Sequence, residues 1–207
     1  MQRTRTPAAR PPCTLALGAI TLERWRGEDV EELHRAVSST IEHLLPWMPW
    51  AREGDRDARA RFLRESEQGW AAGERFEYAI RDAQADLIGG VGLMSRIGPR
   101  GLEIGYWVHA AHTRRGVATL AAAAATEAAL GLAEIDHVEI HHDEGNVASG
   151  RVPARLGFSR TATFLQKPTA PGDVGVEVHW RLDESDFQTS AAAALLDSVR
   201  QPMGGQR

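Results

Sequence analysis

Several features that mark specialised classes of protein are scarce in this sequence. It contains one cysteine, Cys13, so it can form no internal disulfide and offers no cysteine cluster to a metal. Its longest apolar run, residues 117–125, is too short and too rich in alanine to span a membrane. Its net charge of −4 provides no general attraction to nucleic acid. We therefore expect a globular, cytoplasmic protein without membrane or nucleic-acid partners.

Length and composition favour a single folded domain. The chain has 207 residues, of which 43% are hydrophobic and 25% charged, and a chain of this size buries a core without covalent cross-links. Residues 1–13 are basic and proline-rich, and we interpret them as a disordered N-terminal lead. We assign residues 14–185 to the domain, and residues 186–207 to a short helix with a loose tail.

Hydrophobic periodicity indicates the order of the elements. Alternating patterns predict strands at 14–25, 76–82, 87–95, 102–109, 137–142, 158–164 and 174–182. Helical spacing predicts helices after Asp29 and at 55–72, 117–132 and 147–156, with a proline-broken helical turn at 39–51. Strands 102–109 and 137–142 should be parallel because a helix connects them. The order predicts an α+β fold with one mixed sheet of about six to seven strands.

An arginine–glycine turn directly precedes the alanine-rich helix. Arg114, Arg115 and Gly116 stand where the first amide groups of a helix have no internal partner. Such a helix start binds anions, and the two arginines strengthen it for a phosphate-bearing ligand. The turn has neither a Walker pattern nor a dinucleotide fingerprint, and a merely solvated basic turn remains the alternative.

Five stretches occur together in a characteristic order: ITLERWRGEDVEEL, EHLLPWMPWA, LIGGVGL, LEIGYWVHAAHTRRGVAT and NVASGRVPARLGF. With them, residues 14–183 resemble the GNAT acetyltransferase superfamily, and more narrowly its branch of ribosomal-protein N-terminal acetyltransferases, the Rim type. The resemblance implies a mostly antiparallel sheet with helices on both faces and a parallel pair that splays apart in the middle. It also implies an N-acetyltransferase that uses acetyl-CoA and no metal.

The resemblance assigns a set of residues to coenzyme A. The pyrophosphate should lie against the turn formed by Arg114, Arg115, Gly116, Val117, Ala118 and Thr119. The pantetheine arm should pair with backbone groups near Trp107 and Val108. Asn146 either only caps the following helix or also binds this arm. The turn departs from the family pattern, since Thr113 replaces a Gln or Arg and Arg114 replaces a Gly.

The resemblance also implies two catalytic residues. Ser149 stands where Rim-type enzymes place the donor to the departing thiolate, whereas the tyrosine of many other GNAT enzymes is replaced by Pro153. Pro153 removes a helical hydrogen bond and could displace this serine. Glu103 is the expected general base, with His109, His141 and His142 as rivals. The HHDE stretch at 141–144 is poorly arranged to surround a metal ion.

The acceptor side is the least defined part of the prediction. Trp47 and Trp50 in the proline-broken segment should line it, together with Tyr78, although the tryptophans could also only cover the sheet. The acceptor is a protein N-terminus or a small-molecule amine, and the sequence does not choose between them. A homodimer is left open. The alternative function is an acyl-CoA-binding or interaction module without turnover.

Overall fold

The computed structural model describes residues 10–52 and 54–201. Eight strands form one sheet in the order β1-β2-β3-β4-β5-β6-β8-β7. The strands are β1 Thr14–Leu17, β2 Ile20–Arg24, β3 Arg75–Asp82, β4 Leu87–Met94, β5 Gly101–Val108, β6 His137–Asp143, β7 Ser159–Leu165 and β8 Val176–Asp183. The helices are α1 Val30–Ser39, α2 Ile41–Leu44, α3 Arg56–Ala72, α4 Val117–Leu130, α5 Val147–Leu156, α6 Glu184–Phe187 and α7 Ala191–Arg200.

The predicted α+β fold is confirmed, but the sheet has one strand more than the predicted six to seven. Residues 14–25 form two antiparallel strands, β1 and β2, instead of one. Gly18 lies between them with a φ of 65°, a left-handed conformation that glycine adopts without strain and that reverses the chain. The predicted strand residues are therefore confirmed, but the segment counted as one strand is two strands joined by a turn.

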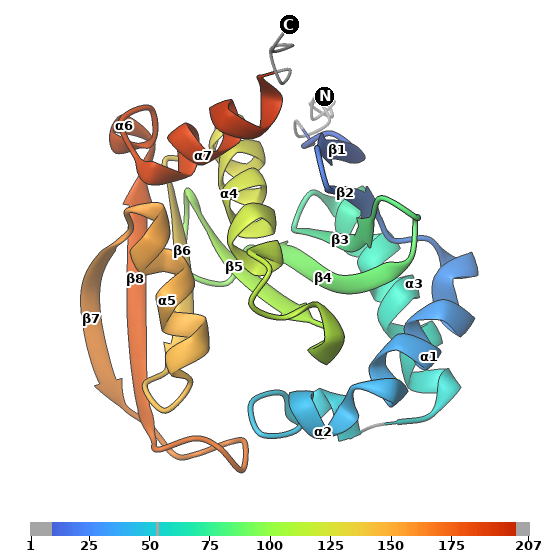
Figure 1. Cartoon of the computed structure of the whole chain (residues 1–207). Coiled ribbons are helices and arrows are strands. Elements are labelled where there is room, and N and C mark those ends of the chain that lie inside the picture. The colour runs from blue at the N-terminus through green and yellow to red at the C-terminus, as the bar shows by residue number, and fades with distance from the viewer. Residues whose placement is uncertain (1–9, 53, 202–207) are drawn as a thin grey trace, which may run out of the picture.

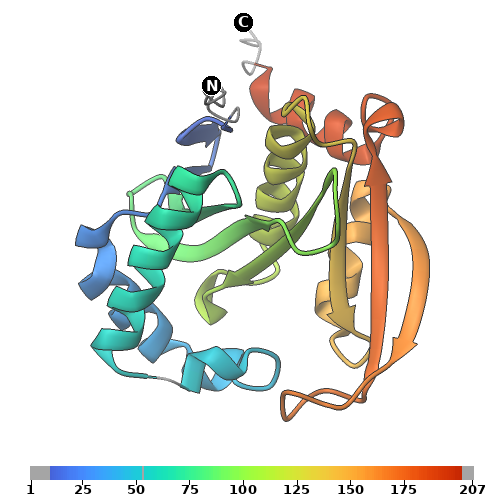
Figure 2. The ribbon, with the colours of Figure 1, turned by 180° about the vertical axis from the view of Figure 1, so that it is seen from behind.

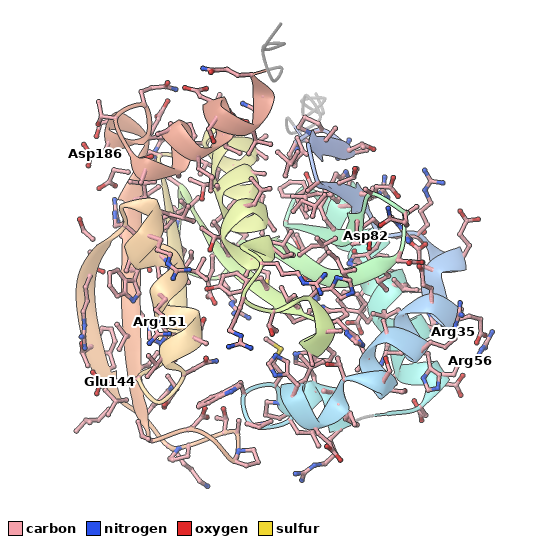
Figure 3. The ribbon with its side chains drawn as sticks, viewed as in Figure 1. Arg35, Arg56, Asp82, Glu144, Arg151 and Asp186 are labelled. Atoms are coloured by element: carbon pink, nitrogen blue, oxygen red, sulfur yellow. The ribbon has the colours of Figure 1, made fainter. Side chains whose placement is uncertain are left out.

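Helices cover both faces of the sheet (Figures 1 and 2). Helices α4, α5 and α7 lie on one face, where the alanines Ala121–Ala125 are buried in the main core. Helices α1, α2 and α3 lie on the other face around a second buried cluster that includes Trp25, Leu33 and Leu63. Charged side chains such as Arg35, Arg56 and Asp186 point away from both cores (Figure 3).

The central parallel pair of strands stays together over a short length only. Strands β5 and β6 pair from Gly101 opposite His137 to Glu103 opposite Glu139. Beyond Glu103, β5 follows β4 as far as Val108, while β6 follows β8 as far as Asp143. The backbone groups of β5 that face β6 thus lose their strand partner. This separation opens a gap in the middle of the sheet, as the resemblance implied.

Residues next to both chain ends belong to the folded domain, which corrects two predicted boundaries. Arg10 donates to the carbonyl of Trp70 at 2.9 Å, and the amide of Arg24 donates to the carbonyl of Cys13 at 2.8 Å. Residues 10–13 are therefore not a disordered lead. Helix α7 contributes buried Leu196 to the main core, so the compact unit extends past residue 185. The predicted lead at 1–9 and tail at 202–207 lie outside the described residues.

No helix among the described residues is long and apolar enough to cross a membrane.

Asp143 fixes the loop between β7 and β8 to the end of β6. Its carboxylate accepts hydrogen bonds from the backbone amides of Gly145, Val174, Gly175 and Val176 at 2.8–3.2 Å. Burial raises the pKa of this carboxyl, but the four amides outweigh burial and hold the pKa below its ordinary value. The loop continues to Gly172, whose amide donates to the carbonyl of Pro46 at 2.7 Å. Asp143 thereby helps to hold the two halves of the molecule together.

We predict that Asp143→Asn lowers the free energy of unfolding by about 2 kcal/mol, because an amide replaces a charged acceptor of several hydrogen bonds. Since the pKa of Asp143 is depressed in the folded state, its stabilisation is complete above the unfolded pKa of about 4 and is lost as pH falls through the lower folded pKa. Urea unfolding of both proteins from pH 7 to pH 2.5 measures this, and the difference should shrink in acid. Glu144→Gln is the matched control, because Glu144 is exposed (Figure 3). An equal loss in the control would contradict the prediction.

Candidate active site

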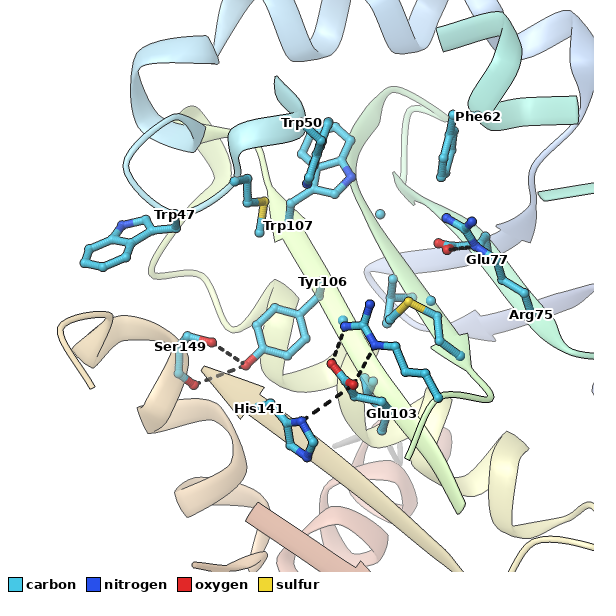
Figure 4. A pocket seen from close by; sticks show the side chains of 18 of the residues that line it. Trp47, Trp50, Phe62, Arg75, Glu77, Glu103, Tyr106, Trp107, His141 and Ser149 are labelled. Carbon is cyan, nitrogen blue, oxygen red and sulfur yellow. Dashed lines mark hydrogen bonds and ion pairs between the residues drawn. The ribbon is translucent and has the colours of Figure 1, made fainter. Parts of the chain in front are cut away.

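A cavity of about 550 Å³ lies along the gap between β5 and β6 and extends to α3 and to the segment 47–50 that follows α2. Aromatic side chains form one end, including Trp47, Trp50, Phe62 and Trp107 (Figure 4). Ionisable and polar side chains form the other end, including Glu103, His141, Asn146 and Ser149. The cavity thus joins an apolar wall to groups that exchange protons.

Trp47 and Trp50 line the aromatic end of the cavity. Trp50 packs edge-on against Trp107, with ring centroids 6.3 Å apart. Gly172 of the β7–β8 loop lies against Trp47, close enough that a Cβ atom there would come within 2.9 Å of the indole. The proline-broken segment and the loop therefore close the cavity together on this side.

Tyr78 does not line this cavity, which corrects the prediction. Side chains alternate along β3, so Glu77 faces the cavity and Tyr78 faces the opposite core. Tyr78 packs against Trp70 at 5.1 Å and donates to the carbonyl of Pro12 at 2.9 Å. Burial raises the pKa of its phenol. The role of this residue is structural, since it ties the N-terminal segment to the core.

Asn146 and Ser149 are positioned by the start of α5. The Asn146 side chain caps the helix by accepting from the amide of Ser149 at 3.1 Å. The Ser149 hydroxyl lies 3.1 Å from the hydroxyl of Tyr106, which reaches across the gap from β5 (Figure 4). Burial raises the pKa of Tyr106, and its hydrogen bond to Ser149 partly offsets this. The sequence analysis missed Tyr106, because no residue near it in the chain indicates that α5 lies opposite.

Tyr106 compensates for the hydrogen bond that Pro153 removes from α5. Proline has no amide hydrogen, so the carbonyl of Ser149 four residues earlier loses its helical partner. The Tyr106 hydroxyl donates to this carbonyl at 3.1 Å, and α5 continues from Val147 to Leu156. A backbone acceptor that would otherwise be unsatisfied thus fixes the phenol beside the serine hydroxyl.

Glu103 lies at the cavity wall but does not stand alone there. It is nearly buried, and both its oxygens bind Arg96, one of them at 2.6 Å from Nε. Nδ1 of His141 faces one of these oxygens at 3.6 Å. The carboxylate expected to act as the general base is therefore part of an Arg96–Glu103–His141 group.

The structure separates the three rival histidines. His109 lies outside the cavity, where its Nε2 is hydrogen-bonded to the Ser39 hydroxyl at 3.1 Å. Burial is the main cause that lowers the pKa of His109, and neighbouring histidines lower it further. Both ring nitrogens of His142 are occupied, since Trp180 donates to one at 3.0 Å and the other contacts the carbonyl of Asp143 at 2.7 Å. His141 holds the Glu139 carboxylate with Nε2 at 2.6 Å, which leaves Nδ1 facing the cavity wall.

The turn before α4 has the features of an anion site. Gly116 begins the helix with a φ of 79° and no side chain caps the helix start, whereas side chains of Asp55, Asn146 and Ser190 cap α3, α5 and α7. Arg114 also has a positive φ of 58°, at the position where the family pattern has glycine. The first amides of α4, from Val117 to Thr119, have no partner within the helix.

The backbone of β5 offers further unpaired groups in the gap. The amide of His109 donates to the carbonyl of Ile88 on β4, and successive residues of a strand direct their backbone groups to opposite sides. Tyr106 and Val108 therefore direct theirs to the gap. The carbonyl of Trp107 points to β4 instead, where a Cβ on Gly89 would approach it to 2.4 Å. This corrects the prediction for the backbone of Trp107, whose side chain lines the cavity.

The residues Glu139, His141 and His179 bring metal-ligand types together, with the ligand atoms within 4.8 Å of one another. However, the rings of His141 and His179 are stacked, with centroids 3.4 Å apart and planes within 10° of parallel. A metal ion lies in the plane of each imidazole that binds it, and two stacked planes share no such point. In this arrangement the two rings cannot bind one ion.

The solved structures that are similar to this fold include the following three, all at low sequence identity. RimJ of Mycobacterium smegmatis, in complex with CoA-disulfide, has a TM-score of 0.80 and 20% identity, with 93% of this chain and 98% of that chain covered. RimL, a ribosomal L7/L12 α-N-protein acetyltransferase in complex with coenzyme A, has a TM-score of 0.76 and 18% identity, with 82% of this chain and 97% of that chain covered. The microcin C7 self-immunity acetyltransferase MccE, in complex with acetyl-CoA and AMP, has a TM-score of 0.73 and 18% identity, with 80% of this chain and 92% of that chain covered.

Curated protein sequences gave no significant match. A family model described as an acetyltransferase (GNAT) domain, in contrast, matches residues 19–159, which is more than half of the chain. The splayed parallel strands and the uncapped start of α4 both lie within the matched residues. The chain therefore belongs to the GNAT acetyltransferase family.

Proposed function

We propose that this protein is an acetyl-CoA-dependent N-acetyltransferase of the Rim type that acts on a primary amine. The observation that carries the proposal is that the hydroxyls of Tyr106 and Ser149 face each other across the gap between β5 and β6, at a cavity with an aromatic wall. The chain leads from the end of β5 to the uncapped start of α4. Membership of an acetyltransferase family and the coenzyme-bound similar structures support the same activity.

The residues of this site suit coenzyme A. The first amides of α4 and the side chains of Arg114 and Arg115 offer hydrogen bonds and positive charge to a diphosphate. The backbone groups of Tyr106 and Val108 in the gap suit the amide groups of a pantetheine arm. The Asn146 side chain caps α5 with its oxygen, which leaves its NH₂ group for the same arm.

The proton of the acceptor amine goes to His141 in this proposal. Acetyl-CoA supplies an activated thioester, and the amine forms the new C–N bond while the C–S bond breaks. An alkyl ammonium has a pKa of about 10.4, so the site must remove a proton before attack. Nε2 of His141 is held by Glu139, which leaves Nδ1 as the acceptor at the cavity wall. Glu103, paired with Arg96, provides negative charge that attracts the incoming ammonium.

The thiolate leaves beside the two hydroxyls. Ser149 lies at the start of α5, and Tyr106 both receives and donates a hydrogen bond there. The serine hydroxyl can turn from the phenol toward the sulfur, because the phenol keeps its bond to the backbone carbonyl. Ser149 is thus the donor, and Tyr106 positions it. The second proton of the amine, lost as the C–S bond breaks, replaces the proton that the serine gives to the sulfur.

The acceptor is a protein N-terminus or a small-molecule amine carrying an apolar group for the aromatic wall. RimL is an α-N-protein acetyltransferase, and a spermidine N-acetyltransferase chimera has a similar fold, so both classes of acceptor belong in the test. Homodimer formation, the cytoplasmic location and the absence of nucleic-acid partners stay predictions from the sequence.

The proposed function is tested by thiol release from acetyl-CoA with a panel of N-terminal peptides and small amines. We expect release that requires both an amine and the folded protein, and mass spectrometry should show an amine heavier by one acetyl group. Tight binding of acetyl-CoA without release by any amine would instead support the non-catalytic binding module.

We predict that Gly116→Ala raises the dissociation constant of acetyl-CoA by about tenfold, since an L-residue in the left-handed region costs about 1–2 kcal/mol and the turn relaxes away from its binding conformation. Isothermal titration calorimetry measures the change. Gly98→Ala is the matched control, because Gly98 also has a positive φ and open space around it. Equal weakening in both variants would show that the turn before α4 does not hold the coenzyme.

We predict that Ser149→Ala lowers kcat by roughly 100-fold, the lower end of what a proton-transferring group contributes, and leaves acetyl-CoA affinity nearly unchanged. Ser198→Ala, at an exposed helical serine of α7, should leave both unchanged. Steady-state kinetics and calorimetry measure the two quantities separately. If Ser149→Ala weakens binding as strongly as turnover, the serine supports the coenzyme site and is not the thiolate donor.

A further inference from the structure

A line of alternating carboxylates and imidazoles leads away from the cavity along one face of the sheet. Glu103 lies opposite Glu139 across β5 and β6, and His141 lies opposite His179 across β6 and β8. Side chains two residues apart share a face, which adds Glu177 of β8 to the same row. Of these five residues, only Glu103 and His141 line the cavity. The other three have no role in the reaction as described so far.

The contacts along this row are nearly continuous. Nδ1 of His141 faces Glu103 at 3.6 Å, and its Nε2 lies 2.6 Å from Glu139. The same Glu139 oxygen lies 3.9 Å from Nδ1 of His179, whose Nε2 lies 2.6 Å from Glu177. The one long step, from Glu139 to His179, is within reach of a small side-chain rotation or one bridging water.

Side-chain exposure increases at every step away from the cavity. It is 9% for Glu103, 14% for His141, 16% for Glu139, 18% for His179 and 30% for Glu177. The ring of Phe164 on the edge strand β7 lies over His179 at 4.8 Å and limits its contact with water. The row therefore connects the cavity wall to solvent through groups that are themselves shielded.

The other charged groups on this face are largely engaged with one another. Arg96 binds Glu103, and Arg75 binds Glu77 at 2.6 Å. Arg181 binds Asp183 at 2.6 Å and lies 4.0 Å from Glu139. Asp143, next to Glu177 across the strands, is committed to backbone amides. Glu139, His179 and Glu177 are thus the groups of the face that link His141 to the solvent.

We propose that Glu139, His179 and Glu177 form a proton exit for His141, a role that rests on the proposed function. As Nδ1 of His141 takes the proton of the amine, Nε2 releases its own proton to Glu139. Glu139 passes this proton to Nδ1 of His179, and Nε2 of His179 releases one to Glu177 and then to water. One proton leaves for each acetyl group transferred, and the rings return to their first tautomers by exchange with water.

The test uses variants that keep the shape of the row and remove its proton transfer. Glu139→Gln keeps a hydrogen-bonding side chain, and His179→Phe keeps a ring stacked on His141. In dilute buffer without imidazole, kcat should fall about tenfold in each, below the roughly 100-fold of a direct acid–base group because water replaces part of the exit. The KM for acetyl-CoA should not change, and imidazole added to the buffer should restore most of kcat, because it replaces the lost proton carrier.

Glu144→Gln, an exposed glutamate just after β6, is the matched control and should behave as wild type at every imidazole concentration. Unchanged kcat in Glu139→Gln and His179→Phe would overturn the proposal. A loss that imidazole does not relieve would also overturn it, since it would show a purely structural role.

A measurement without turnover separates this proposal from the proposed function. In ¹⁵N NMR spectra of the resting protein, which report the ring nitrogen that carries the proton, Glu139→Gln should change the ring signals of both His141 and His179, and Glu177→Gln should change mainly those of His179. Ring signals that these substitutions leave unchanged would overturn the exit. Wild-type protein that releases no thiol with any amine would overturn the acetyltransferase function, whatever the NMR spectra show.

Discussion

The separation of β5 and β6 after Glu103 is the constraint on which the site depends. Two neighbouring parallel strands normally satisfy each other's backbone hydrogen bonds along their length, whereas β5 and β6 pair over three residue pairs only. Each strand then continues with its antiparallel neighbour, β4 or β8, so the sheet stays intact on both sides of the gap. The gap exposes backbone groups of β5 and admits the Tyr106 side chain. The proposed proton acceptor His141 lies on one edge of the gap, and Tyr106, which positions the thiolate donor Ser149, lies on the other.

The two halves of the molecule on either side of the gap are held together by a few specific contacts. At one end, the short β5–β6 pairing and the core around α4 join them. At the other, the Tyr106 hydroxyl bonds to Ser149 of α5, and Gly172 of the β7–β8 loop bonds to Pro46. The bond from Tyr106 also replaces the helical bond that Pro153 removes. Structural compensation and placement of the serine hydroxyl are therefore achieved by one contact.

Much of the fold could be predicted because its signals are local. Periodicity located the strands and helices, the connecting helix made β5 and β6 parallel, and Asn146 caps α5 as its position suggested. The motif order also placed the turn at Gly116 at the start of α4. The sheet has one strand more than predicted because the turn at Gly18 divides the segment 14–25, counted as one strand, into two.

The site could be predicted less completely, because it depends on contacts between distant segments. Tyr106 meets Ser149 only after α5 packs against the gap, and Arg96 reaches Glu103 from the loop between β4 and β5. Tyr78 was misplaced by a single step of strand alternation, which exchanges the two faces of a sheet. The choice of His141 among three histidines depends on which ring nitrogens have partners, and this is a property of the folded state alone.

A crystal structure of the protein with acetyl-CoA bound tests the central claim most directly. The account predicts the diphosphate against the amides of Val117–Thr119, the pantetheine arm between β5 and β6, and the thioester sulfur beside the Ser149 hydroxyl. A coenzyme bound outside the gap, or strands β5 and β6 paired beyond Glu103 in the complex, would contradict it.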